Sequence, residues 1–200
     1  DAKEELKSFA ELCDIPVINT MMGLSNFDMS HRLYFGMIGM HGVRAANYAV
    51  SHCDLFILLG ARVGDRAVTA IKQLSNVTVI HIDIDPAEIG KNLSATTPIV
   101  GDLKIILNQL IDGGSKLSHS DWVDELSVVK NEDAEQNCDY VDGVVNPKEF
   151  IHILNEYISD NTVVVADVGQ NQIWTANNIF LKNGRFLTSG GMGTMGYSIP

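Results

Sequence analysis

The chain has 200 residues, of which 46% are hydrophobic, and this is enough for one domain of typical size or for one domain and part of a second. Its 25 acidic residues outnumber its 14 basic residues and give a net charge of −11, which excludes nucleic acids and anionic membrane surfaces as expected partners because both bind clustered cations. No apolar run reaches the roughly 18 residues of a membrane-spanning helix, and the three widely spaced cysteines, which include no Cys-x-x-Cys pair, fit a reducing compartment.

Helices alternate with apolar strands through the first 112 residues. The spacing of apolar residues predicts helices at 2–13, 43–51, 67–74, 86–91 and 103–111, and strands at 15–18, 54–60, 77–83 and 97–101. Asp102 is expected to cap the helix that follows it. Residues 19–42 hold many Met and Gly residues and little regular pattern, which predicts a long functional loop. Strands without alternating polarity, separated by helices, predict an α/β fold with a Rossmann-like parallel sheet and helices on both of its faces.

The rest of the chain divides into a polar connection and a second α/β unit. Residues 113–146 begin with the helix-breaking sequence Gly-Gly-Ser, are polar and acidic, and predict an interdomain connection with one helix over 121–136. Asn146 and Pro147 mark the start of the second unit, as an N-cap and a first helical residue. Its expected elements are a helix to about residue 157, a strand at 162–166, a helix at 170–180 and a strand at 186–188. These ~54 residues are too few to bury a core well, so they are expected to begin a larger domain.

Ligands of parallel α/β sheets bind at the carboxyl ends of the strands. The segments in that position are residues 19–23, 60–66, 83–85 and 101–102. In the second segment, the planar side chains of Arg62 and Arg66 suit the oxygens of a diphosphate, although ordinary surface pairing with Asp65 is an equally good interpretation. Asp83 is placed to accept hydrogen bonds from ribose hydroxyls, whereas Asp85 better suits the start of the next helix.

Three glycine-containing segments also indicate ligand sites. Residues 39–42, Gly-Met-His-Gly, open a helix where the backbone can approach a flat ligand or a phosphate, and a tight turn with a core Met is the competing interpretation. Residues 167–172, Asp-Val-Gly-Gln-Asn-Gln, offer N–H groups at a helix start to a diphosphate, with capping by Asn171 as the alternative. Residues 189–196 are the densest glycine cluster and predict a close approach of the backbone to a ligand. The six histidines have no metal-ligand spacing, and His81 is interpreted as a satisfied core residue.

Together and in this order, these segments resemble the acetolactate synthase family, also called acetohydroxyacid synthase, whose catalytic large subunit uses thiamine diphosphate. The matching stretches are residues 39–50, 54–66, 81–88, 101–102, 167–174 and 188–197. They extend over nearly the whole chain apart from the connection at 113–146. Each motif alone is moderately specific, and their shared order makes the resemblance specific.

The resemblance implies three α/β domains, of which the first binds the thiamine pyrimidine, the central one FAD, and the third the diphosphate through Mg²⁺. It makes residues 1–112 the central FAD-binding-type domain, 113–146 the interdomain connection, and 147–200 the N-terminal part of the thiamine-diphosphate-binding domain. The catalytic glutamate then belongs to an absent first domain, and the Mg²⁺ ligands follow Pro200. No catalytic residue or metal ligand is therefore expected among these residues, and the piece alone is expected to be inactive.

The resemblance also implies cofactor contacts, residue by residue. The positions that match FAD contacts are Thr20, Met21, Met40, His41, Gly42, Gly60, Ala61, Arg62, Asp83, Ile84 and Asp102, with Arg66 as a further candidate for holding an anionic cofactor. The positions that match the loop for the thiamine diphosphate are Gly169, Gln170 and Asn171. The carbonyl of Gly193 would accept a hydrogen bond from the aminopyrimidine, and Met195 would lie beneath the bent cofactor.

Two positions depart from the family pattern. Gly64 stands where many relatives have an Asp that contacts FAD, so one contact is lost. Asn171 stands in place of a His, and its amide can still donate to a phosphate. We expect the diphosphate to bind despite the change at Asn171, and the Gly-Met-His-Gly and Gly-Ala-Arg patterns resemble the FAD-containing biosynthetic type of the family.

The implied reaction decarboxylates pyruvate and joins the two-carbon unit to a second 2-oxoacid, pyruvate or 2-oxobutyrate, to give 2-acetolactate or 2-aceto-2-hydroxybutyrate for branched-chain amino-acid biosynthesis. The expected assembly is a homodimer or tetramer, with a possible small regulatory subunit, in the cytoplasm; an organellar targeting peptide is not excluded, because the chain starts without a Met. Two alternatives stay open. One is another thiamine-diphosphate carboligase or decarboxylase, similar to glyoxylate carboligase, and the other is a non-catalytic nucleotide-binding module.

Overall fold

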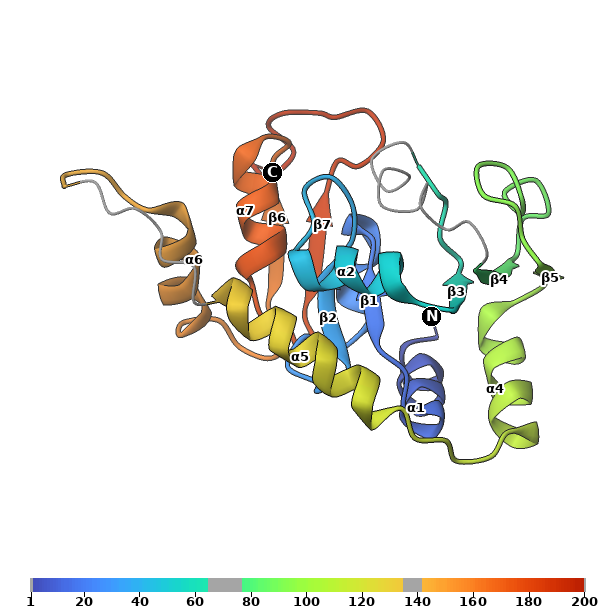
Figure 1. The fold of residues 1–200 in the computed structure, drawn as a ribbon. Helices are drawn as coiled ribbons and strands as arrows, with labels where there is room; N and C mark the ends of the chain where they lie inside the picture. Colours follow the sequence, from blue (N-terminus) through green and yellow to red (C-terminus); the bar gives the residue numbers. More distant parts are fainter. Residues whose placement is uncertain (1, 65–76, 135–141, 200) are drawn as a thin grey trace.

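Parallel strands flanked by helices make up the chain in a computed structural model that describes residues 2–64, 77–134 and 142–199 (Figure 1). The elements in chain order are α1 (Lys3–Cys13), β1 (Val17–Asn19), the 3-10 helix η1 (Met21–Asn26), β2 (Tyr34–Met37), α2 (Arg44–His52), β3 (Leu55–Leu59), β4 (Thr78–Asp83), β5 (Thr97–Val100), α4 (Leu103–Gly113), α5 (Ser120–Ala134), α6 (Pro147–Asn155), β6 (Val163–Ala166), α7 (Gln170–Asn178) and β7 (Arg185–Thr188). Within the described residues, no helix has the length and apolarity needed to cross a membrane.

The described strands form three small parallel sheets. β1 pairs with β2, β4 lies between β3 and β5, and β6 pairs with β7. Figure 1 shows β1, β2, β7 and β6 in the middle of the molecule and the β3–β4–β5 sheet to one side. The predicted α/β class and the parallel pairing are confirmed, but the first unit has two sheets where one was predicted, because β1 and β3 are separated by a cavity instead of pairing.

Two predicted elements were wrong. Residues 19–42 are not one long loop, since they contain η1 and β2, and β2 buries Tyr34, Phe35 and Met37 beside β1. The segment at 86–91 forms successive turns instead of a helix, with the Glu88 amide donating to the Asp85 carbonyl, an i to i+3 bond. The helix expected at 67–74 lies outside the described residues.

Predicted caps account for two helix starts. The carboxylate of Asp102 accepts a hydrogen bond from the Ile105 amide at 3.1 Å, which begins α4. The side chain of Asn146 accepts from the amides of Lys148 and Glu149 at 2.9 and 3.3 Å, which begins α6. Both caps satisfy N–H groups that a helix leaves without intrahelical partners.

The larger hydrophobic core joins elements from both ends of the chain. It packs side chains of α1, β1, β2 and α2 against those of α5, α6, α7 and β7. From α5, Val123, Leu126 and Val129 are buried in this core. The same helix sends Lys130 Nζ to the Tyr34 carbonyl at 2.8 Å, and burial lowers the pKa of this amine. The acidic segment that includes α5 therefore covers α2 and β2.

A short network at Asp14 fastens this arrangement to the end of α1. Asp14 ends the helix in the left-handed conformation, with φ 51°, and its side chain is buried. Its carboxylate accepts hydrogen bonds from the Arg32 guanidinium and from the His119 amide, the second at 2.9 Å. His119 Nδ1 also contacts the Cys13 carbonyl at 2.8 Å, and the Leu117 amide donates to the Leu12 carbonyl at 3.0 Å. The start of α5 is thereby held at the carboxyl end of α1.

Truncation of Leu126 tests whether α5 belongs to the core. We expect Leu126→Ala to lower the free energy of unfolding by about 2–5 kcal/mol, because the side chain is fully buried and leaves a cavity. Val128→Ala on the exposed side of the same helix is the matched control and should change it by less than about 0.5 kcal/mol. Urea unfolding measures both. Equal small effects would mean that α5 is not packed as described.

The Asp14 network predicts a pH dependence of stability. The Arg32 guanidinium, and next the His119 amide, hold the pKa of Asp14 below its ordinary value. The stability that ionised Asp14 contributes is therefore fully present above the pKa of an unfolded Asp, about 3.9. It is lost as the pH falls through the lower pKa that Asp14 has in the folded chain. Asp14→Asn should destabilise the chain near pH 7 and progressively less toward pH 2, roughly where such depressed carboxyls protonate.

Urea midpoints across that pH range measure the difference between Asp14→Asn and the unmodified chain. Asp124→Asn, an exposed position on α5, is the control for the general loss of a negative charge. A gap that stays constant down to low pH would contradict the charge-based explanation.

Candidate functional site

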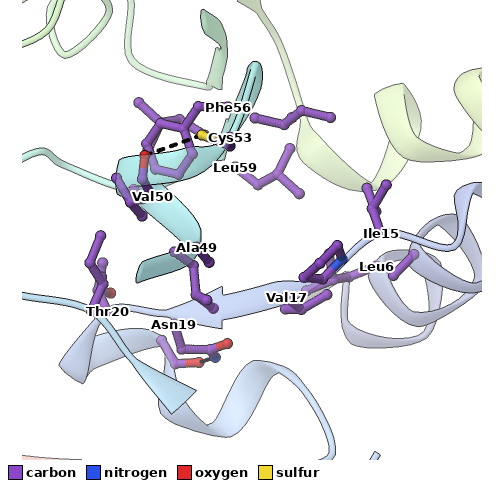
Figure 2. Close-up of a pocket in the computed structure, with 18 of the residues that line it drawn as sticks. Leu6, Ile15, Val17, Asn19, Thr20, Ala49, Val50, Cys53, Phe56 and Leu59 are labelled. Carbon is purple, nitrogen blue, oxygen red and sulfur yellow. Dashed lines mark hydrogen bonds between the residues drawn. The ribbon is translucent and has the colours of Figure 1, made fainter. Parts of the chain in front are cut away.

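A cavity of about 390 Å³ lies between β1 and β3. Its walls are mainly apolar and include Ile18, Val50 and Leu58. One end is polar, because Asn19 ends β1 there and Thr20 follows it. Figure 2 shows Asn19 and Thr20 at this end and Leu6 and Ile15 at the other. An apolar cavity with a few polar groups at one end suits a small molecule that has a flat apolar part and a polar group.

The structure brings four of the predicted FAD-contacting residues to this cavity. The residues are Thr20, Gly60, Ala61 and Arg62. All four follow the end of β1 or β3, the kind of position at which ligand sites of parallel sheets are expected. Gly60 follows β3 directly, and its amide donates to the Ile82 carbonyl of β4 at 2.8 Å. Arg62 is exposed, so its charged group can reach a ligand from the solvent side.

The other predicted FAD contacts are not among the residues that line the cavity. These residues are Met21, Met40, His41, Gly42, Asp83, Ile84 and Asp102. Met21 packs against the larger core, while Met40 and Ile84 are exposed. Arg66 and its possible partner Asp65 lie outside the described residues.

Asn47 fixes the Gly-Met-His-Gly loop at the start of α2. Its side chain accepts from the Gly39 amide at 2.9 Å and donates to the Gly39 carbonyl at 3.0 Å. A Cβ at Gly42 would overlap the Met37 carbonyl oxygen, so the backbone packs too closely there for any side chain. The segment is a tight turn, closed by the Gly42 amide on the Gly39 carbonyl at 2.9 Å, but Met40 is 63% exposed and is not a core residue.

The three carboxylates that follow β4 and β5 each hold a nearby backbone amide. Asp83 accepts from the Asp85 amide at 2.9 Å, and Asp85 accepts from the Ala87 amide at 2.9 Å. Asp102 caps α4, as described above. Asp83 is buried, and each of these groups retains a second oxygen for a ligand. Asp85 begins a turn, so its predicted role as a helix start was wrong.

The second unit places its predicted residues at the carboxyl edge of β6 and β7. Asp167 follows β6 and accepts from the Ser198 amide at 2.7 Å and the Gly196 amide at 3.0 Å. The hydrogen bond from the Ser198 amide has the largest effect, and together with the bond from the Gly196 amide it holds the pKa of Asp167 below its ordinary value. Gln172 of α7 donates to the Thr188 hydroxyl at 2.7 Å within the core. The residues 189–196, called the glycine loop below, therefore end beside the start of α7.

The start of α7 has no side-chain cap. Gly169 occupies the N-cap position, so the proposed capping role of Asn171 is wrong. Gly169, Gln170 and Asn171 stand at this start, where the first N–H groups of a helix have no intrahelical partner and favour an anion. Gly193 and Met195 lie in the exposed glycine loop, and the Met195 side chain is 79% exposed.

Buried amide oxygens without partners mark two positions, of which Asn19 belongs to the predicted ligand segment 19–23 and Asn177 was not predicted. Asn19 Oδ1, at the cavity, and Asn177 Oδ1, on α7, have no hydrogen-bond partner among the described residues. Their amide nitrogens are used, since Asn19 donates to the Gly23 carbonyl and Asn177 to the His41 carbonyl, the latter at 2.8 Å. An unpaired buried acceptor is costly and points to a ligand donor. A short polar side chain at the end of β1 was the available signal for Asn19.

His81 differs from its predicted role. It is buried in β4, between Leu58 and Pro98 of the neighbouring strands, but neither ring nitrogen has a hydrogen-bond partner within the described part of the chain. The prediction that His81 is buried in a strand is therefore confirmed. The prediction that its ring nitrogens have hydrogen-bond partners was wrong. In residues 2–64, 77–134 and 142–199, no group of three or more His, Cys, Asp or Glu side chains is arranged to hold a metal ion.

Two family profiles match the chain. The central domain of thiamine pyrophosphate enzymes matches residues 1–110, and their C-terminal domain, which binds thiamine pyrophosphate, matches residues 167–200. The first match alone covers more than half of the chain.

Curated relatives are similar over nearly all of this chain. The probable acetolactate synthase large subunit of Methanocaldococcus jannaschii is 42% identical over 100% of this chain and 35% of its own length. The acetolactate synthase large subunit of Lactococcus lactis subsp. lactis is 41% identical over 97% of this chain and 34% of its own length. The acetolactate synthase of Mycobacterium leprae is 40% identical over 100% of this chain and 33% of its own length. The chain spans about a third of the length of the curated relatives it matches.

Proposed function

We propose that this chain, which belongs to the thiamine pyrophosphate enzyme family, is part of an acetolactate synthase large subunit. The observation that carries the proposal is the identity of about 40% to acetolactate synthases along the whole chain. The reaction would join pyruvate to a second 2-oxoacid, pyruvate or 2-oxobutyrate, and release one CO2 to give 2-acetolactate or 2-aceto-2-hydroxybutyrate. We further propose a homodimer or tetramer, with a possible small regulatory subunit, in the cytoplasm.

The proposed division of the chain follows its two cofactor sites. Residues 1–112 would form the central FAD-binding-type domain, 113–146 the connection, and 147–200 the first part of the thiamine-diphosphate-binding domain. The packing of α5 into the larger core gives the connection a second role, because it holds the two parts together.

The cavity between β1 and β3 fits part of FAD. Its apolar walls suit a flat ring, and the unpaired Oδ1 of Asn19 would accept an N–H from that ring. Thr20, Gly60 and Ala61 offer small polar or backbone groups at the carboxyl edge, where Arg62 would hold the diphosphate. Met40, His41, Gly42, Asp83, Ile84 and Asp102 would contact the parts of FAD that extend outside the cavity.

The start of α7 and the glycine loop fit thiamine diphosphate. Gly169, Gln170 and Asn171 would bind its diphosphate through amide groups at the uncapped helix start, together with Mg²⁺. The Gly193 carbonyl would orient the aminopyrimidine, and Met195 would support the cofactor with a large apolar side chain that is otherwise exposed. When bound, this cofactor supplies the nucleophile for decarboxylation of pyruvate and transfer of the two-carbon unit.

Product analysis tests the reaction. The full-length protein that carries this chain should form 2-acetolactate from pyruvate only when thiamine diphosphate and Mg²⁺ are both supplied, as measured by mass spectrometry. The 200-residue chain alone should form none, because the resemblance places the activating glutamate and the metal ligands outside it. A preference of the full-length protein for glyoxylate would favour a different carboligase, and product formation by the chain alone would contradict the domain assignment.

Flavin binding tests the cavity. Arg62→Gln should weaken FAD binding about tenfold or more, because a charge-assisted hydrogen bond to a phosphate contributes roughly 1.5–3 kcal/mol. Arg185→Gln is the matched control, since this exposed Arg begins β7 at the amino end of the strand. Fluorescence titration of FAD measures both variants. Equal affinities would place the diphosphate elsewhere, and FAD binding without any thiamine-dependent activity would favour a nucleotide-binding module.

A further inference from the structure

The glycine loop is held at both of its ends by different parts of the chain. Near its carboxyl end, Asp167 binds the Gly196 and Ser198 amides. Near its start, Gly190 packs directly on the side chain of Met22 in η1, whose Cγ and Cε would lie 3.2 Å from a Cβ at that position and whose sulfur would overlap it. Met22 and Gly190 are therefore in van der Waals contact, and only glycine fits there without displacing Met22.

The 3-10 helix η1 also lines the cavity. Met22, Gly23 and Asn26 are among the lining residues. The same helix holds β7, since Ser25 Oγ accepts from the Phe186 amide at 2.6 Å. One turn of backbone therefore separates the cavity proposed for FAD from the strand and loop proposed for thiamine diphosphate.

Met22 belongs to both sites. Its side chain borders the cavity on one side and Gly190 on the other, although it is 64% exposed and contributes little to the core. An unbranched, flexible side chain can adjust to a ligand and transmit the displacement to the backbone that it contacts. A ligand that binds one conformation of η1 more tightly also favours the loop conformation that packs against it. The coupling is reciprocal, so an ordered loop would strengthen binding of that ligand.

We propose that Met22 is a positioning residue for the glycine loop and that a flavin in the cavity orders this loop through the Met22–Gly190 contact. The identities of the two ligands rest on the proposed function, but the contact does not.

Hydrogen exchange of the loop amides, followed by mass spectrometry on the full-length protein that carries this chain, tests the contact without ligands. Met22→Ala should speed exchange over residues 190–196 by roughly fivefold, the size expected for a lost packing contact. Met22→Leu should restore most of the protection, and Val128→Ala, exposed on α5, should leave it unchanged. Unchanged loop exchange in Met22→Ala would overturn the proposal.

A pair of glycine substitutions checks that the effect passes through this contact. Gly190→Ala should loosen the loop in the unmodified chain and have less effect in the Met22→Ala background, where the added methyl group has room. Gly191→Ala is the matched control, because nothing lies within 4 Å of a Cβ at that position. Additive effects of Gly190→Ala and Met22→Ala would contradict a direct contact.

Added FAD tests the coupling. FAD should slow loop exchange by roughly threefold or more in the unmodified chain and in Met22→Leu, and should have no such effect in Met22→Ala at saturating FAD. Slowing that is equal in Met22→Ala would overturn the coupling through Met22. If FAD does not bind at all, the proposed cavity assignment fails, and the ligand-free exchange experiment alone decides the positioning role.

Discussion

The carboxylate of Asp14 is the interaction on which the arrangement of the larger core depends. It joins three segments that are far apart in sequence, because it receives the Arg32 guanidinium and the His119 amide at the end of α1. Residues 114–119 form a short connection without regular structure, so its attachment at Asp14 sets where α5 begins. From that point α5 runs along α2 and β2 and buries Leu126 (Figure 1). The first sheet, the polar connection and the second unit then share one core, and both proposed cofactor sites take their positions from it.

The net charge of the chain raises the question of how anionic cofactors would bind. With −11 overall, long-range attraction is unfavourable, so binding must rest on short-range groups. At the cavity these are Arg62 and the backbone that follows β1 and β3, and at α7 they are amides of an uncapped helix start. Such groups recognise a diphosphate by geometry. The negative surface elsewhere would repel nucleic acid, which presents the same phosphate groups in far greater number.

Local signals account for what could be predicted from the sequence. The continuous apolar runs at 55–59 and 78–83 were recognisable as buried strands, and the caps at Asp102 and Asn146 were recognisable from residue type and position. β2 was missed because Gly36 interrupts its apolar run and because its pairing with β1 spans fourteen residues of irregular chain. Thr20 and Arg62 could be assigned to one edge by topology, whereas the roles of Asn19 and Met22 depend on side-chain packing that no periodicity encodes. The unsatisfied state of His81 had no sequence signal at all.

The cavity between β1 and β3 also affects how the chain responds to hydrostatic pressure. Internal void volume disappears when a protein unfolds, so pressure favours the unfolded state in proportion to the empty space it removes. The cavity of about 390 Å³ between the two small sheets adds to the volume that unfolding removes, so pressure is expected to favour unfolding here. An occupant would remove that volume difference together with the apolar surface, and the same ligand that orders the site would make the whole chain stiffer and harder to compress.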